Sequence, residues 1–170
     1  MSGRGYMPQP ERLDWGTPEH VFQYAQRVFG IHTIDLAASH ANTKCSDYIT
    51  EEMNALEMNW GFDMNLPPNA KGWLNPPYGR MLKPFAKKVS EQLLAGEIRA
   101  VTVLVPARTD TEWFSIFVKH AVKVVFIKGR LKFDGVKGSA PFPSVLMHLV
   151  AEPKKPTPAT FYSVRIPKEN

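Results

Sequence analysis

The stretch Lys71-Gly72-Trp73-Leu74-Asn75-Pro76-Pro77-Tyr78-Gly79 joins a short apolar run to a turn that no β-strand can continue through. Two consecutive prolines fix φ and remove two backbone donors, so a strand over Lys71–Leu74 has to stop there, and the turn after it is stiff. In doubly wound α/β sheets, ligands bind beyond the carboxyl ends of the strands. We therefore expect a binding site at Asn75-Pro76-Pro77-Tyr78.

The residues that follow this turn predict a helix and then a buried strand. Residues 81–95 carry apolar side chains at helical spacing, and Gly96 follows as a stop signal. Residues 100–105 are almost continuously apolar, which is typical of a strand covered on both faces of its sheet. Asp110 can then cap a further helix that runs through residue 117.

Upstream, Thr17 and Pro18 have the character of an N-cap and a first helical residue, and residues 18–29 carry an amphipathic pattern. Residues 31–36 are a short β-prone run that reaches Asp35. Further strands are expected over residues 122–127, 131–133, 144–150 and 160–166. This order, β–α–β–α–β followed by a β-rich end, predicts an α/β fold with a three-layer mixed sheet and an antiparallel, β-rich C-terminal end.

Composition is typical of one compact domain, which we expect over residues 14–170 after a flexible arm of residues 1–13. The chain has 170 residues, of which 44% are hydrophobic and 22% charged. Cys45 is the single cysteine, so neither an internal disulfide nor a zinc-binding cysteine pair is expected. No apolar stretch approaches the ~20 residues of a membrane span. These features predict a soluble cytoplasmic protein with no metal site and no membrane partner.

The net charge of +5 is unevenly distributed along the chain. Residues 1–80 carry 6 Lys and Arg against 9 Asp and Glu, whereas residues 81–170 carry 15 against 7. Lys and Arg side chains displace condensed counterions from a nucleic-acid backbone, so a basic half suits such a partner. A generically basic soluble protein has the same charge, and charge alone does not decide between the two.

The Asn-Pro-Pro-Tyr turn has the groups that methylation of an exocyclic amine needs. Such a reaction lines up the nitrogen lone pair with an electrophilic methyl group while acceptors hold the amine hydrogens. Asn75 Oδ1 and the Pro76 carbonyl can be those acceptors, and Tyr78 can stack on a base. The alternative is a structural turn with an Asn cap and a packed Tyr. The segment resembles the Asn/Asp-Pro-Pro-Tyr motif of amino-methyltransferases that act on adenine N6, cytosine N4 or protein glutamine.

Further landmarks extend the resemblance over roughly residues 14–150. In chain order they are Trp15-x-Thr17-Pro18, Phe29-Gly30, Ile34-Asp35-x-Ala37-Ala38-Ser39, Asn42-x-Lys44-Cys45, Trp60, Asn75-Pro76-Pro77-Tyr78-Gly79, Leu104-x-Pro106-x-Arg108-Thr109-Asp110-Thr111-x-Trp113-Phe114 and Gly129-Arg130-Leu131-x-Phe133. Together they resemble the small phage-type Dam DNA N-6-adenine-methyltransferases.

This resemblance implies a Rossmann-like class I methyltransferase fold, S-adenosylmethionine as the methyl donor and adenine in DNA as the acceptor. It also implies that Thr17, Pro18, Asp35, Ala37 and Ala38 surround the methionine part of the cofactor. A carboxylate at the end of a strand can accept hydrogen bonds from the amino group of the cofactor and is favourable near its positive charge.

Two departures from the family pattern concern the cofactor. The turn at Ala37-Ala38-Ser39 has no glycine, although most methyltransferases have a Gly-rich turn after the first strand. Asn54 stands where related sequences more often have an acid that contacts the cofactor adenine, so the acceptor oxygen is kept and the charge is lost. The acid expected at the ribose hydroxyls is Asp47, Glu51 or Glu52.

An enzyme that methylates adenine N6 in a duplex has to extrude the base. Arg108, which follows the strand over residues 100–105, suits contact with phosphate. The loop over residues 134–143, beside Lys128, Arg130 and Lys132, is the candidate DNA-facing element. Its alternative is an ordinary basic hairpin.

Two other functions stay open at this point. One is the same chemistry on an RNA base or a protein glutamine. The other is a non-catalytic DNA-binding relic, which Asn54 and the missing glycines suggest. The resemblance to phage enzymes implies a phage or prophage origin, a bacterial host and protection of DNA from restriction, while the recognition sequence and the oligomeric state stay undetermined.

Overall fold

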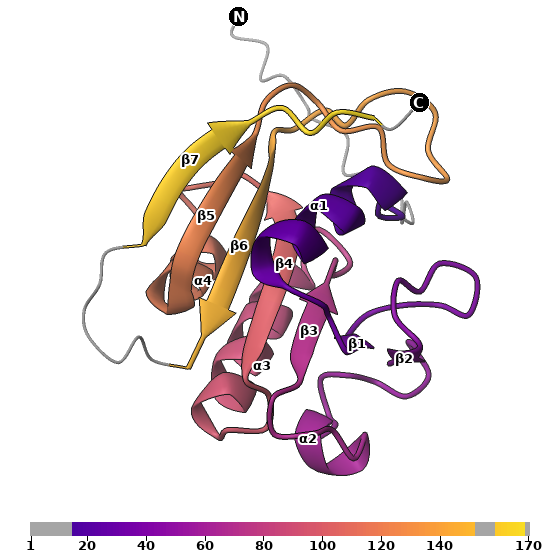
Figure 1. Ribbon diagram of the computed structural model, residues 1–170, viewed down its shortest axis with the longest axis vertical. Coiled ribbons are helices and arrows are strands. Elements are labelled where there is room, and N and C mark those ends of the chain that lie inside the picture. Colours follow the sequence, from indigo (N-terminus) through magenta and orange to yellow (C-terminus); the bar gives the residue numbers. More distant parts are fainter. Residues whose placement is uncertain (1–14, 152–158, 169–170) are drawn as a thin grey trace, which may run out of the picture.

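The computed structural model describes residues 15–151 and 159–168, and the flexible arm predicted over residues 1–13 lies outside these ranges. Its elements follow in the order α1 (Glu19–Phe29), β1 (Ile34–Asp35), β2 (Asp47–Tyr48), α2 (Trp60–Asp63), β3 (Lys71–Leu74), α3 (Leu82–Leu94), β4 (Ala100–Pro106), α4 (Glu112–His120), β5 (Ala121–Ile127), β6 (Ser144–Val150) and β7 (Thr160–Val164) (Figure 1).

All seven strands belong to one sheet with the order β2-β1-β3-β4-β6-β5-β7. β6 pairs antiparallel with both β4 and β5, and every other neighbouring pair is parallel. The predicted mixed α/β sheet with an antiparallel member is confirmed. The prediction of an antiparallel C-terminal end is right for β6 and wrong for β7, because β7 adds to the far edge of β5 in parallel.

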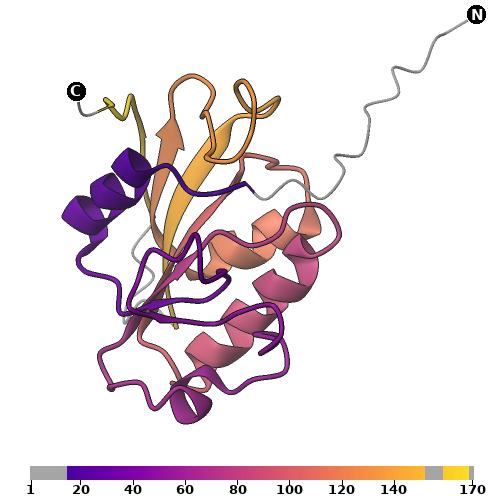
Figure 2. The same cartoon turned by 90° about the vertical axis from the view of Figure 1, so that its right-hand side faces the viewer.

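Helices cover both faces of the sheet, which gives three layers. α1 lies on one face, and α3 and α4 lie on the other (Figures 1 and 2). The side chains of β4 alternate accordingly: Val101, Val103 and Val105 belong to the core under α3 and α4, and Leu104 belongs to the core under α1. Burial on both faces explains why β4 is apolar along its length.

The two predicted helix caps are wrong by one residue each. α1 begins at Glu19 with Pro18 as N-cap and no side-chain cap bond, because the Thr17 hydroxyl accepts a hydrogen bond from Asn75 instead. At α4 the N-cap is Thr111, whose hydroxyl accepts from Phe114 N, and the predicted cap Asp110 lies in the preceding turn. In both places the N-cap is the residue that follows the predicted one.

Two predicted strands differ from the structure. The run over residues 31–36 is a strand only at Ile34–Asp35, since Ile31 is 80% exposed outside the sheet. Residues 131–133 are not a strand. Leu131 and Phe133 are buried under α1, so their alternation reflects anchoring to the core, and only the next residue, Asp134, forms an isolated bridge, with Gly16.

The ends of four strands meet at one edge of the sheet. β1, β3 and β4 run parallel, and β5 has the same direction because both β4 and β5 are antiparallel to β6. Asp35 ends β1, and Asn75 follows β3 directly. Arg108 comes soon after β4, and Lys128 comes directly after β5. This edge therefore carries the residues that the sequence singled out.

Candidate active site

A cavity of about 800 Å³ opens at the carboxyl ends of β1 and β3. Such a volume falls in the range of roughly 300–1,000 Å³ that small-molecule sites occupy. Most of the predicted site residues line it, namely Thr17, Asp35, Ala37, Ala38, Asn54, Asn75, Pro76, Pro77 and Tyr78. The chain therefore brings together residues as far apart in sequence as Thr17 and Tyr78.

Asn75 has a fixed orientation in this cavity. Its Nδ2 donates to the carbonyl oxygen of Trp15 at 2.5 Å and to Thr17 Oγ1 at 3.1 Å. A carbonyl oxygen can only accept, so the amide nitrogen has to face Trp15 and the amide oxygen has to face away. Oδ1 is buried and has no hydrogen-bond partner among residues 15–151 and 159–168. A buried acceptor left open in this way is exceptional and indicates an absent donor.

Tyr78 packs in an aromatic cluster beside Asn75. Its ring lies 6.3 Å from that of Trp15 at an interplanar angle of 24°, and it meets the Phe142 ring edge-on at 5.5 Å. The phenol O–H donates to the Leu104 carbonyl at 3.3 Å. Burial raises the pKa of Tyr78 well above its usual range, so the phenol stays neutral. Tyr78 is thus placed as a fixed, uncharged wall of the cavity.

Asp35 places a buried carboxyl group at the end of β1. The residue is 3% exposed, and its oxygens accept from Lys44 N at 3.0 Å and from Ala37 N at 3.4 Å. Burial raises its pKa to about 6, against the opposing effect of these two backbone donors and of the Lys44 charge. Because an anion here is only partly compensated, a cationic ligand would stabilise it.

Asn54 occupies a backbone conformation that explains its identity. Its φ of 58° lies in the left-handed region, where Asn is tolerated far better than most residues. The position therefore selects Asn through its backbone, while its side chain still lines the cavity. Of the three acids considered for the ribose, Glu51 also lines the cavity, and Asp47 and Glu52 do not.

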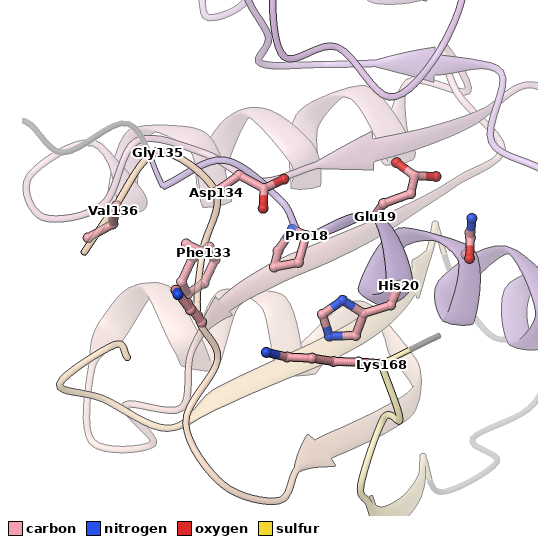
Figure 3. A pocket seen from close by; sticks show the side chains of 10 residues that line it. Pro18, Glu19, His20, Phe133, Asp134, Gly135, Val136 and Lys168 are labelled. Carbon is pink, nitrogen blue, oxygen red and sulfur yellow. The ribbon is translucent and has the colours of Figure 1, made fainter. Parts of the chain in front are cut away.

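Several predicted residues lie outside this cavity. Pro18 and Lys132 line a second cavity of about 520 Å³ between the first turn of α1 and the loop after β5, together with Glu19, Asp134 and Lys168 (Figure 3). This second cavity carries charges of both signs.

The remaining basic residues are exposed and line neither cavity. Arg108 follows β4, and Lys128 and Arg130 follow β5. They share the sheet edge with Asn75 but are spread along it.

The cavity also includes residues for which the sequence predicts no role. Trp15, whose carbonyl accepts from the Asn75 amide, and Gly16 line the cavity, as do Arg80 and Met81 after Gly79. Gly79 has a φ of 85°, which bends the chain sharply after the motif. These cavity residues could have been predicted from their closeness in sequence to Thr17 and Tyr78, since a residue near a site residue in a stiff turn remains near the site.

Two absences hold for residues 15–151 and 159–168. Among those residues, no group of three or more His, Cys, Asp and Glu side chains is placed to hold a metal ion. No helix within them is both long enough and apolar enough to cross a membrane.

The sequence is similar to one described protein family and to curated proteins that carry the same description. The sequence profile of the family described as DNA N-6-adenine-methyltransferase (Dam) matches residues 5–155. A protein of Escherichia phage T1 named DNA N-6-adenine-methyltransferase is 33% identical over 138 residues, which are 79% of this chain and 54% of that protein. A protein of Haemophilus phage HP1 with the same name is 32% identical over 114 residues, which are 66% of this chain and 61% of that protein. The chain thus spans little more than half the length of these two curated relatives.

Proposed function

The chain belongs to the DNA N-6-adenine-methyltransferase (Dam) family, and from this premise we propose that it methylates the N6 amine of adenine in DNA. The mixed α/β fold, with a seven-stranded, mostly parallel sheet, is consistent with a methyltransferase-like fold. We assign it to the Rossmann-like class I arrangement. The observation that carries the proposal is Asn75 Oδ1, a buried acceptor that has no partner among the described residues and belongs to a residue that lines a large cavity at the end of a strand.

The proposed role of the Asn-Pro-Pro-Tyr turn is to hold a flipped adenine. Asn75 Oδ1 and the Pro76 carbonyl accept hydrogen bonds from the two hydrogens of the exocyclic amine, which draws the nitrogen toward a tetrahedral geometry. Tyr78 contributes an aromatic face to the base. Extrusion of a paired base costs a few kcal/mol of stacking and pairing, which protein contacts have to offset.

The residues of the cavity fit S-adenosylmethionine as the donor. When bound, this cofactor supplies an electrophilic methyl group on a positively charged sulfur. The buried Asp35 carboxylate suits its cationic methionine part, with Ala37 and Ala38 around it, whereas the hydroxyl of Thr17 at the cavity wall accepts from Asn75. Glu51 is the acid that suits the ribose hydroxyls, and the Asn54 side chain suits the adenine amine.

The proposed DNA contact lies along the same sheet edge. Arg108, Lys128, Arg130 and Lys132 are exposed there, and Asp134 and Phe142 of the loop over residues 134–143 contact Gly16 and Trp15, which line the cavity. Exposed cations suit phosphates. The phage relatives support a phage or prophage origin and action in a bacterial host.

The test is methyl transfer from labelled S-adenosylmethionine to DNA, RNA and protein in parallel, followed by nucleoside mass spectrometry of DNA from expressing cells. We expect N6-methyladenine in DNA and label in neither other acceptor. Asn75→Ala should abolish the product, because it removes the oxygen that accepts a hydrogen bond from the adenine amine. The matched control is Asn69→Ala, at an exposed turn before β3, which should keep wild-type yield.

Each failure has a separate meaning. Label in RNA or protein instead of DNA would show that the methyl acceptor is that molecule and not DNA. No cofactor binding in calorimetry at millimolar concentration would leave a non-catalytic DNA-binding protein. Persistent N6-methyladenine in Asn75→Ala would refute the role of that residue.

A further inference from the structure

The orientation of the Asn75 amide depends on residues 15–17, a segment that we name the orienting strap. We propose that the strap is a working part of the active site, and that Thr17 is a positioning residue which holds Asn75 Oδ1 toward the target amine. This inference rests on the methyl transfer proposed above. It gives the Thr17 hydroxyl a role in the rate of transfer instead of a role in cofactor affinity.

Two acceptors of the strap select one of the two orientations of the amide. Nδ2 donates to the Trp15 carbonyl at 2.5 Å and to Thr17 Oγ1 at 3.1 Å. The terminal torsion of an Asn side chain is broad and roughly two-fold, so it does not choose between the orientations by itself. Rotation by half a turn would direct two N–H donors at an amine whose own hydrogens need acceptors. The strap therefore holds the donor nitrogen toward itself and leaves the acceptor oxygen on the opposite side of the amide.

The strap is itself anchored on its other side. Gly16 exchanges two backbone hydrogen bonds with Asp134, at 3.2 Å and 2.8 Å. The Trp15 ring meets the rings of Phe133 and Phe142 edge-on at 5.2 Å and 5.3 Å. A Cβ atom at Gly16 would stand 3.1 Å from that of Asp134, so the backbones approach closely. Thr17 is 4% exposed. The acceptors are thus held by contacts that do not involve Asn75.

Thr17 is also used in a way that its place in the sequence does not favour. A Thr at an N-cap normally accepts from a backbone N–H of the first turn, and the sequence predicts Thr17 there, but Pro18 takes that position. Here α1 starts without any side-chain cap bond, and the hydroxyl accepts from Asn75 instead. The Thr17 hydroxyl therefore accepts from the side-chain amide of Asn75 and not from a backbone N–H of α1.

The decisive comparison is Thr17→Val, which replaces the hydroxyl by a methyl group of similar size, with Thr17→Ser as the control that keeps the acceptor. Single-turnover rates are measured on DNA at saturating cofactor, and the dissociation constants of cofactor and DNA are measured separately. We expect Thr17→Val to slow transfer by roughly 10- to 100-fold, the range that misplacement of a catalytic group produces. Both dissociation constants should stay within about twofold, and Thr17→Ser should restore most of the rate.

Two results of these rate and binding measurements would overturn the inference: a wild-type rate in Thr17→Val, or a raised cofactor dissociation constant with an unchanged rate at saturation. The second result would make Thr17 a cofactor ligand. Should Thr17→Val not fold, Thr17→Ala removes the same acceptor without an added methyl group and replaces it in every comparison.

A second readout needs neither substrate nor cofactor. The side-chain amide protons of Asn75, observed by NMR in 15N-labelled protein, should exchange slowly with water in the wild type and in Thr17→Ser, and faster in Thr17→Val. Equal exchange in all three would overturn the orienting role. If the wild type orders this amide but methylates no acceptor, the proposed function fails while the geometry of the strap stands.

Discussion

Asp35 is the residue whose ionisation bears most directly on the proposed cofactor site. Its carboxyl is buried at the end of β1, and burial raises its pKa to about 6. The group is therefore partly protonated in mildly acidic solution and charged above neutrality. A positively charged ligand interacts favourably with the carboxylate alone, so binding and deprotonation are linked.

We expect the affinity for S-adenosylmethionine to fall as the pH drops through 6, by about tenfold for each further pH unit, and to level off above pH 7. Calorimetric titrations between pH 5 and 8 measure this dependence. Asp35→Asn should bind weakly at every pH, whereas Asp47→Asn, at an exposed position outside the cavity, should keep the wild-type profile. A flat profile in the wild type would exclude Asp35 from the site.

At the scale of elements, the segment after β5 carries the proposed contact with DNA. Lys128, Arg130 and Lys132 are exposed at the sheet edge where Asn75 also lies. Phe133 and Asp134 then anchor the same segment to the orienting strap. The basic side chains are therefore carried by backbone that is fixed close to the proposed base site.

Replacing Lys128, Arg130 and Lys132 together with Gln should flatten the dependence of log K on log salt concentration by up to about 2.7, since each phosphate contact contributes about 0.9 to the slope. Fluorescence anisotropy of labelled duplex at several salt concentrations measures the slope. Arg99 and Lys119 are exposed before the first residues of β4 and β5, at the opposite edge, and their replacement should leave the slope unchanged. An unaltered slope in the triple variant would remove this segment from the interface.

The sequence predicts those elements that leave a pattern in neighbouring residues. β3 and β4 were predictable because prolines end one and continuous apolar burial marks the other. β2 and α2 were missed because two-residue and four-residue elements have no detectable period.

The predicted site shows the same limit. The residues of the Asn-Pro-Pro-Tyr turn adjoin one another in the chain, so their proximity was certain. The contact of Asn75 with Trp15 spans 60 positions and depends on packing that no local pattern encodes. The Thr17 cap failed for this reason: a distant donor took its hydroxyl.

Two histidines, the buried His32 and the half-buried His148, link the layer that contains α1 to the sheet. Thr102 Oγ1 lies 2.8 Å from His32 Nε2 and 3.0 Å from His148 Nδ1, and Phe29 of α1 stacks on His148 at 5.1 Å. Burial, with smaller effects of neighbouring positive charge, lowers the pKa of His32 to about 3 and that of His148 to about 4. Both rings are therefore neutral in the folded protein at pH 5.

Below pH 6.5 these two histidines are protonated in the unfolded chain but stay neutral in the folded protein. The free energy of unfolding should therefore fall as the pH drops toward 4. The loss is at most about 3 kcal/mol per histidine, while Asp35, whose pKa is raised, opposes it between pH 6 and 4. Urea unfolding at several pH values measures it. His148→Gln should flatten the fall, and the same change at the exposed His40 should not. Equal slopes in both variants would exclude His148 as a cause.

The position of β6 has a consequence for the order in which the chain assembles. β4 and β5 precede β6 in the chain but do not pair with each other, since β6 lies between them. Until residues 144–150 arrive, both strands present open edges, which readily pair with other chains. Closing the sheet late, over long sequence separations, is also slow. During synthesis the protein therefore passes through a stage in which its half-built sheet needs either rapid completion or protection from aggregation.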